Sequence, residues 1–337
     1  MRQLPGAGVR PVVLMPVLGL ATLAMAAASL ALGYAALPLG QAFADAIAGR
    51  ASLPALVLME LRLPRALLGA LVGFSLGMAG AAMQGLMRNP LAEPGIVGIS
   101  SAAALGAVTA FYSGLSATVA LALPLGGIAG ALLATLVLFV LLGPGASTMT
   151  LILAGVALNS FAGAATALAL NLAPNPYAAL EIVFWLMGSL ADRSMSHVWL
   201  VLPLMLAGWL LMASTAPALD ALSLGEETAA SLGFDLTWLR ARLIGGAALA
   251  VGSAVAVTGA IGFVGLVVPH LLRPLVGHRP GRLLVASGFG GAVLVLAADL
   301  GVRLAPVRPE LKLGVVTALI GAPFLFGLVQ RLRREAL

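Results

Sequence analysis

The sequence predicts an all-α polytopic membrane protein of about ten transmembrane helices, on the basis of its composition, its hydropathy and the length of its apolar blocks. Of 337 residues, 61% are hydrophobic and 9% are charged, and the mean hydropathy is +1.10. Soluble proteins carry roughly 25% charged residues, so a soluble fold of this composition could not cover its own surface. Because a span needs about 20 residues, we expect residues 1–337 to form a single transmembrane domain.

Breaks in hydropathy divide the chain into expected spans at 12–35, 64–86, 94–112, 117–142, 150–171, 197–216, 238–261, 283–300 and 313–330. A shorter helical piece at 263–275 would make a tenth. The first block follows Arg2 and Arg10 and is too long for a signal-peptide core. We therefore expect it to be a spanning helix whose N-terminus stays in the cytoplasm.

Loop charge agrees with this division. If the chain crosses ten times with both ends in the cytoplasm, eleven of the 18 basic residues lie inside, a modest bias in the usual direction. The remaining basic residues, on the outer side, are Arg50, Arg62, Arg65, Arg193, Arg303, Arg308 and Lys312. The basic residues are scattered and are not interleaved with aromatic side chains, so we do not expect nucleic-acid binding.

Glycines predict close packing of the second expected span. Gly69, Gly73 and Gly77 stand four residues apart, and Gly80 follows one turn later. Small residues at this spacing let helix backbones approach each other in lipid. The alternative is that these glycines contact a transported substrate. Packing alone explains their spacing without such a role.

The residues that would carry covalent chemistry are missing from the sequence. There is no cysteine, the three histidines form no HExxH motif, and no GxSxG motif occurs. A phosphate loop is also absent, because the single lysine, Lys312, is followed by Leu313. Ion-coupled carriers place ionisable groups within their spans, and here only Asp299 lies close to a span end. Energy for active transport would therefore come from another subunit.

One charged stretch, Leu219–Arg242, interrupts the apolar blocks. Its composition favours short helical turns broken by Gly225 and Gly233, and its acidic residues require water. Leu222, Ala229 and Leu232 can bury apolar surface, while Glu226 and Glu227 can face solvent or basic residues. The segment is thus expected to present a contact surface; the alternative is an ordinary solvated loop.

Short motifs in a fixed order resemble a known family. They are Arg62-Leu63-Pro64-Arg65, Asn89-Pro90-Leu91-Ala92-Glu93-Pro94-Gly95 after Gln84, Leu153-Ala154-Gly155-Val156-Ala157, Trp185-Leu186-Met187-Gly188, Leu222-Ser223-Leu224-Gly225-Glu226, Gly259-Ala260-Ile261-Gly262-Phe263-Val264-Gly265, Val268-Pro269-His270, Glu310-Leu311 and Gly321-Ala322-Pro323-Phe324. From about Glu60 to Arg331 the chain resembles FecCD-type permeases, which serve ABC importers of ferric siderophores, haem and cobalamin. The cobalamin importer permeases look especially similar around Asn89–Pro94.

The resemblance implies a type II ABC importer permease fold in the bacterial inner membrane. It implies a homodimer with the substrate path along its two-fold axis, two cytoplasmic ATPase subunits and a periplasmic substrate-binding protein. ATP and Mg would be used by the ATPase subunits, and this chain would bind no cofactor and catalyse no reaction. An ion-coupled secondary transporter without an ATPase is the alternative function.

The resemblance also implies three sets of site residues. The ATPase-coupling segment, about 219–233, includes Leu222, Leu224, Gly225, Glu226, Glu227, Leu232 and Gly233. Binding-protein docking would use Arg62, Arg65 and Arg303. Headgroup anchoring or an internal pair of Asp299 with Arg303, one turn apart, is the alternative for these arginines.

The third set, the translocation path and its gates, comprises Gln84, Asn89, Pro90, Ser147 and Thr148. A helix-to-helix hydrogen bond is the alternative for Gln84, a cap before proline for Asn89, and a plain helix cap for Ser147 and Thr148. The chain departs from the family pattern in two places. Lys312 stands where proline is usual after Glu-Leu, and Asp220 stands where asparagine is common.

Overall fold

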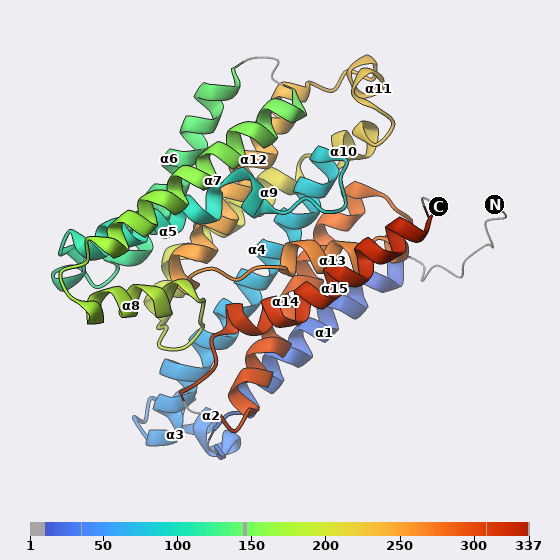
Figure 1. Cartoon of the computed structure of the whole chain (residues 1–337). Helices are drawn as coiled ribbons and strands as arrows, with labels where there is room; N and C mark the ends of the chain where they lie inside the picture. Colours follow the sequence, from blue (N-terminus) through green and yellow to red (C-terminus); the bar gives the residue numbers. More distant parts are fainter. Residues whose placement is uncertain (1–10, 35, 144–146, 308, 336–337) are drawn as a thin grey trace.

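The computed structural model describes residues 11–34, 36–143, 147–307 and 309–335, which form helices joined by turns and loops (Figure 1). The α-helices are α1 (Pro11–Ala31), α2 (Leu39–Ile47), α3 (Leu53–Leu56), α4 (Leu63–Met87), α5 (Ile99–Tyr112), α6 (Ala122–Leu142), α7 (Thr148–Asn171), α8 (Pro176–Leu186), α9 (Met195–Ala213), α10 (Ala216–Leu222), α11 (Glu226–Ser231), α12 (Leu236–Thr258), α13 (Val264–Leu272), α14 (Pro280–Leu304) and α15 (Leu313–Glu335). A π-helical segment, η1 (Val57–Arg62), joins α3 to α4. Single 3₁₀ turns occur at η2 (Pro94–Val97), η3 (Leu115–Ala117) and η4 (Pro274–Val276).

The helices confirm the predicted all-α membrane fold. Within the described ranges, seven helical stretches are long and apolar enough to span a membrane: α1, Leu53–Met87, α6, α7, α9, α12 and α14. Shorter apolar helices are α5, α8 and the Leu313–Leu328 part of α15. Each expected span corresponds to a helix with bounds within a few residues, except that 94–112 starts with η2 and becomes α5 only after Gly98, whose φ of 78° breaks the helix.

Three short helices were not predicted. The expected tenth piece is the nine-residue α13, followed by η4. Helices α2, α3 and α8 are too short to leave a span-length signal, and α8 begins at Pro176, in the first helical position, where the missing backbone N–H costs nothing. Arg2, Arg10 and Arg308 of the predicted loop-charge pattern lie outside the described residues.

Helix α4 runs through the middle of the bundle and packs on α14, α13, α12 and α9. A Cβ added at Gly73 would overlap the backbone of Gly291 in α14, and one at Gly77 would overlap the carbonyl of Ser287. At Gly80 it would overlap the backbone of Gly265 in α13. The prediction that these glycines bring helix backbones together is confirmed.

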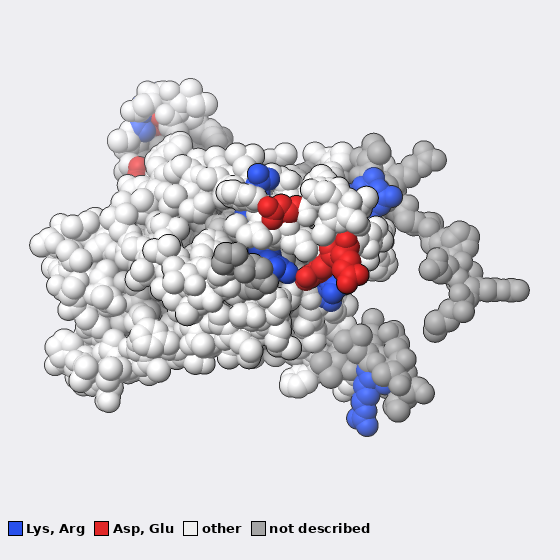
Figure 2. Space-filling model, turned by 90° about the horizontal axis from the view of Figure 1, so that it is seen from above, with Lys and Arg blue, Asp and Glu red and all other residues white. Residues whose placement is uncertain are grey.

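The two ends of the bundle differ. Helices α10 and α11 lie at one end and α2 and α3 at the other (Figure 1). Figure 2, which views the α10–α11 end, shows acidic and basic side chains next to one another, while wide areas of the same face are uncharged. The charged groups of this end are therefore concentrated in one part of the face.

Gly77→Ala should lower the stability of the protein, because its Cβ would force α4 and α14 apart. Overpacking of this kind costs about 1–3 kcal/mol. Gly245→Ala in α12 is the matched control, since nothing lies within 4 Å of its added Cβ and alanine is favoured over glycine in a helix. Thermal unfolding of the detergent-solubilised protein measures both; an unfolding temperature for Gly77→Ala at or above that of Gly245→Ala contradicts the packing argument.

Candidate functional site

Residues 216–233, which we call the α10–α11 segment, form a compact projection at the charged end of the bundle (Figure 1). Helix α10 ends before Gly225, which has a φ of 119°, and α11 ends before Gly233, which has a φ of 86°. Both backbone conformations favour glycine over any residue with a Cβ. The prediction of short helical turns bounded by these two glycines is confirmed.

The apolar residues of the α10–α11 segment divide into two groups. Leu224 and Leu232 are 69% and 60% exposed, and Glu227 is also exposed. Leu222 and Ala229, which were expected to offer apolar surface to a partner, are instead buried within this chain. Their side chains hold the segment against the bundle, so the exposed leucines and Glu227 are what the segment presents outward.

Polar contacts fix the α10–α11 segment to the membrane helices. The backbone N–H of Gly281, in the first turn of α14, donates to Asp220 Oδ1 at 2.8 Å. Asp220, which departs from the family pattern, thus caps the N-terminus of α14. The carboxylate of Glu226 accepts from Arg240 of α12, with Nη2 3.2 Å from both Oε1 and Oε2. Glu226, which was expected to face solvent or basic residues, pairs with the basic residue Arg240 and keeps 39% of its side chain exposed.

At the opposite end, Asp299 is the centre of a buried charge cluster. Nη2 of Arg65 lies 2.7 Å from Asp299 Oδ1, and Arg65 also binds Glu310. Nε of Arg303 lies 3.1 Å from Asp299 Oδ2, so the internal pair predicted as the alternative is present. Arginine suits this position because its fork of donors can bind carboxylates in pairs.

Arg62 and Arg303 also bind the C-terminal end of α1. Nη1 of Arg62 lies 2.8 Å from the carbonyl oxygens of Leu30 and Ala31. Nη1 of Arg303 donates to the Ser29 carbonyl at 3.0 Å, and Nη2 donates to the Ser29 hydroxyl at 2.6 Å. The last carbonyls of a helix have no partner within it, and these guanidinium groups supply the missing donors.

These contacts change the interpretation of the predicted docking arginines. Arg62 and Arg303 are only 6% and 4% exposed. They were expected at the outer surface. They lie inside the bundle instead, because both bind unpaired carbonyls of α1 and Arg303 also pairs with the buried carboxylate of Asp299. Arg65 and Glu310 lie nearer the surface, with side-chain exposures of 12% and 21%.

The surface pair Asp45–Arg50 lies at the same end, on α2 and the turn after it. Nη2 of Arg50 lies 2.7 Å from Asp45 Oδ1, and the arginine side chain is 66% exposed. A hydrogen bond from Ser52, together with Arg50, lowers the pKa of Asp45 below its ordinary value. Only the arginine of this pair is solvated, because the Asp45 side chain is 10% exposed.

Gln84 and Asn89, which were predicted to line the translocation path, each make a hydrogen bond within the chain. Gln84 is buried, accepts from Arg273, and places Nε2 3.4 Å from the carbonyl oxygens of Gly265 and Leu266. The helix-to-helix hydrogen bond predicted as the alternative is therefore present, between α4 and α13. Asn89 accepts from Leu91 N at 2.9 Å and closes the turn that contains Pro90.

Ser147 and Thr148 begin α7. Ser147 Oγ accepts from Thr150 N at 3.1 Å, which is the plain helix cap predicted as its alternative. Thr148 does not act as a cap in the same way. Its hydroxyl lies 3.3 Å from Glu226 Oε1, so the start of α7 touches the α10–α11 segment.

Sequence reasoning missed the polar centre of α7. Asn159 and Ser160 are exposed midway along this helix, and Asn159 is hydrogen-bonded to Ser101 of α5. Polar side chains facing hydrocarbon cost several kcal/mol unless they are paired, so this face of α7 suits contact with protein or water better than contact with lipid. An asparagine at the centre of the apolar block 150–171 was the signal that could have identified it.

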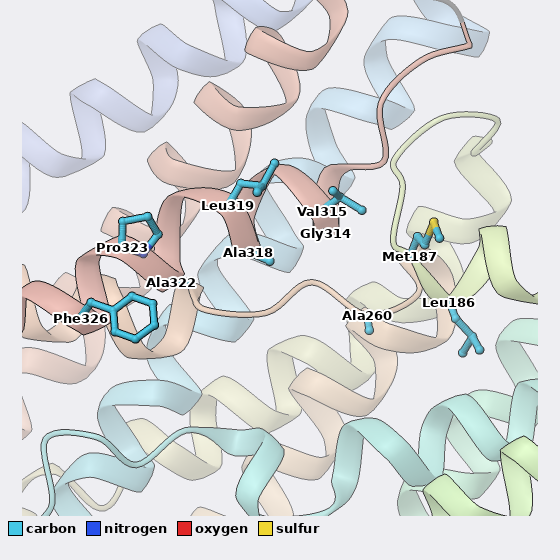
Figure 3. Close-up of a pocket in the computed structure, with 10 residues that line it drawn as sticks. All are labelled: Leu186, Met187, Ala260, Gly314, Val315, Ala318, Leu319, Ala322, Pro323 and Phe326. Atoms are coloured by element: carbon cyan, nitrogen blue, oxygen red, sulfur yellow. The ribbon is translucent and has the colours of Figure 1, made fainter. Parts of the chain in front are cut away.

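Two adjoining cavities lie along α8 and the start of α15, and the first of them also borders the loop before α13. One, of about 640 Å³, follows α15 and is almost wholly apolar (Figure 3); its lining residues include Met187, Ala260 and Phe326. The other, of about 880 Å³, shares Met187 and Val315 with it and includes charged side chains such as Arg193 and Lys312. Lys312 Nζ lies 5.8 Å from the centre of the Phe184 ring, at cation–π distance.

A known protein family and a solved structure match this chain. The sequence model of the FecCD transport family matches residues 21–331. The chain belongs to the FecCD transport family. Among its FecCD relatives, the chain is 40% identical over 296 residues to the vitamin B12 import system permease protein BtuC of Vibrio cholerae, covering 87% of this chain and 88% of that protein.

Two further similar proteins agree with this assignment. An uncharacterized ABC transporter permease protein, YvrB of Bacillus subtilis, is 42% identical over 272 residues, covering 79% of this chain and 76% of that protein. A solved structure described as an inward-facing conformation of a metal-chelate type ABC transporter superposes with a TM-score of 0.82. It is 30% identical and covers 95% of this chain and 99% of that one, which confirms the predicted permease fold.

Asp299→Asn should strongly destabilise this FecCD chain, because Arg65 and Arg303 would lose their shared counter-charge in a buried site. Removing one member of a buried ion pair costs about 3–5 kcal/mol. Asp45→Asn is the control: its single arginine partner is 66% exposed and stays solvated when the carboxylate is neutralised, so we expect a smaller loss. The measurement is thermal unfolding in detergent; equal shifts in the two variants would refute a structural role for the buried cluster.

Proposed function

We propose that this chain is the membrane permease subunit of an ATP-driven importer that moves a bulky metal-chelate nutrient, such as cobalamin, haem or a ferric siderophore, across the inner membrane. The similarity to a vitamin B12 import permease and to a metal-chelate type transporter supports this class of substrate. Membership of the FecCD family supports the role of a transport subunit without catalytic chemistry of its own.

The observation that most supports ATP-driven transport is the α10–α11 segment. It presents Leu224 and Leu232 outward and is fixed to α14 and α12 through Asp220 and Glu226. A projection of this kind suits a cleft in a soluble partner, because exposed leucines gain by burial while the anchors transmit force. The sequence has no phosphate loop, so we assign ATP and Mg to two separate cytoplasmic ATPase subunits.

The substrate path is proposed to lie between two copies of the chain. The exposed face of α7, with Asn159 and Ser160, and the cavities along α8 and α15 would meet the same surfaces of the second copy. The wide, weakly polar wall along α15 suits a large ligand that must be released. ATP binding and hydrolysis would move the α10–α11 segments and open the path to one side and then the other, by alternating access.

In the proposed orientation the α10–α11 end is cytoplasmic, as are both termini, and the α2–α3 end faces the periplasmic binding protein. The arginines near the α10–α11 end, Arg240, Arg242, Arg279 and Arg282, agree with the positive-inside rule. Among the predicted docking arginines, Arg65 is the one whose side chain reaches furthest toward the surface. Acidic residues of the binding protein would compete with Glu310 for it.

Arg65→Gln should weaken docking of the binding protein, and more strongly at low salt, because a charge that acts across an interface is screened by ions. Arg50→Gln, at the same end and largely exposed, is the control for general surface charge. Affinity is measured by binding of the binding protein to the permease in nanodiscs at two salt concentrations. Equal loss in the two variants removes Arg65 from the docking surface.

The experiment that tests the proposed function is uptake in proteoliposomes that contain the permease, its ATPase and its binding protein. Labelled cobalamin, haem and a ferric siderophore are offered in parallel. Accumulation of one of them, lost without ATP or without the binding protein, is the expected result. Transport that persists without nucleotide would instead favour the ion-coupled secondary transporter.

In the same assay Gly225→Trp should abolish ATP-driven uptake while membrane insertion is retained. A tryptophan at a φ of 119° is strained and adds a bulky ring to the start of α11. Gly40→Trp in α2 is the control, because it lies at the other end of the molecule with nothing within 4 Å of its added Cβ. Normal uptake by Gly225→Trp would show that the segment does not couple to the ATPase.

A further inference from the structure

The carboxylate of Glu226 joins three helices at the base of the α10–α11 segment. Glu226 is the first residue of α11, directly after Gly225. Its two oxygens lie 3.2 Å from Arg240 Nη2 on α12, and Oε1 also lies 3.3 Å from the hydroxyl of Thr148 on α7. Arg240 is mostly buried, with 17% of its side chain exposed. Glu226 is thus held by the chain's own helices.

The two halves of the α10–α11 segment are attached to different helices. Helix α10 is bound to α14 through Asp220 and Gly281. Helix α11 is bound to α12 and α7 through Glu226. Gly225, which lies between them with a φ of 119°, is the point where the two attachments can shift relative to each other.

Helix α7 differs from the helices that form the core. Only 17% of its most apolar stretch is buried, against 78% for the corresponding stretch of α12. Its exposed face carries Asn159 and Ser160. Few contacts within this chain hold α7 in place, and a force applied at its first turn acts on the whole helix because its backbone hydrogen bonds keep it rigid.

We infer that Glu226 is a positioning residue that links α11 to the first turn of α7 through Thr148, so that movement of the α10–α11 segment displaces the helix whose polar face lines the path. This inference rests on the proposed function. It assigns Glu226 an internal role in place of a direct contact with the ATPase, and it makes Thr148 the receiving group. Arg240 keeps the carboxylate oriented toward Thr148.

Thr148→Val tests the link, because valine keeps the shape of the side chain and removes the hydroxyl donor. The readout is the amount of ligand taken up per ATP hydrolysed in proteoliposomes with the ATPase and binding protein. We expect this ratio to fall about 2- to 10-fold, the effect of losing one hydrogen bond in the coupled movement, while ATP hydrolysis continues. Thr148→Ser retains the hydroxyl and should restore the ratio.

Thr150→Val is the matched control. Thr150 lies in the same turn of α7 and bonds to Ser147 rather than to Glu226. Its replacement should leave the ratio unchanged. Glu226→Ala should lower the ratio, and the double variant Thr148→Val with Glu226→Ala should be no worse than Glu226→Ala alone, because two residues that act through one contact are not additive.

Several results would overturn the inference. They are an unchanged ratio in Thr148→Val, equal losses in Thr148→Val and Thr150→Val, and additive losses in the double variant. Loss of ATPase assembly in Glu226→Ala with Thr148→Val unaffected would place Glu226 at the ATPase surface instead. Failure of the unaltered chain to assemble with any ATPase would refute the proposed function itself. This result differs from a failure of the Glu226–Thr148 link, because it is seen with the unaltered chain before any variant is compared.

Discussion

Direct contact between the backbones of α4 and α14 is the constraint on which the rest of the structure depends. Lipid provides no hydrophobic force between helices, so close packing must hold them together. Gly73 and Gly77 allow that contact, and Gly80 extends it to α13. The same pair of helices carries the Asp299 cluster near one end and, through Gly281, the anchor of α10 at the other. Both ends of the molecule are therefore positioned by one rigid unit.

The charged groups inside the bundle stabilise this rigid unit through contacts within the chain. Arg62 and Arg303 complete the C-terminal end of α1, whose carbonyls would otherwise lack donors in an apolar environment. Asp299 balances the positive charge that this arrangement buries. Gln84 and Arg273 similarly join α4 to the short helix α13, where irregular backbone needs partners.

Rigidity and mobility are separated in the same molecule. In the most apolar stretches of α4 and α12, 78% of the residues are buried, whereas in that of α7 only 17% are buried. Helix α7 also has a polar, exposed centre, and Glu226 connects it to the α10–α11 segment. The proposed alternating access would use this division, because a path can open only if one wall moves while its frame stays fixed. The apolar cavity along α15 (Figure 3) lies beside that frame, against the loop before α13.

Reading along the chain is enough to predict the membrane class, the positions of the spans, the close packing of α4, and the turns bounded by Gly225 and Gly233. Each of these follows from hydropathy or backbone freedom, which are local properties. The partners of the polar side chains, in contrast, emerge from the packing of the helices. Arg62 pairs with α1, Glu226 with Arg240 and Thr148, and Gln84 with Arg273. A polar residue in a membrane must find a partner, but which helix supplies it depends on which helices are neighbours, and residue spacing along the chain does not specify that.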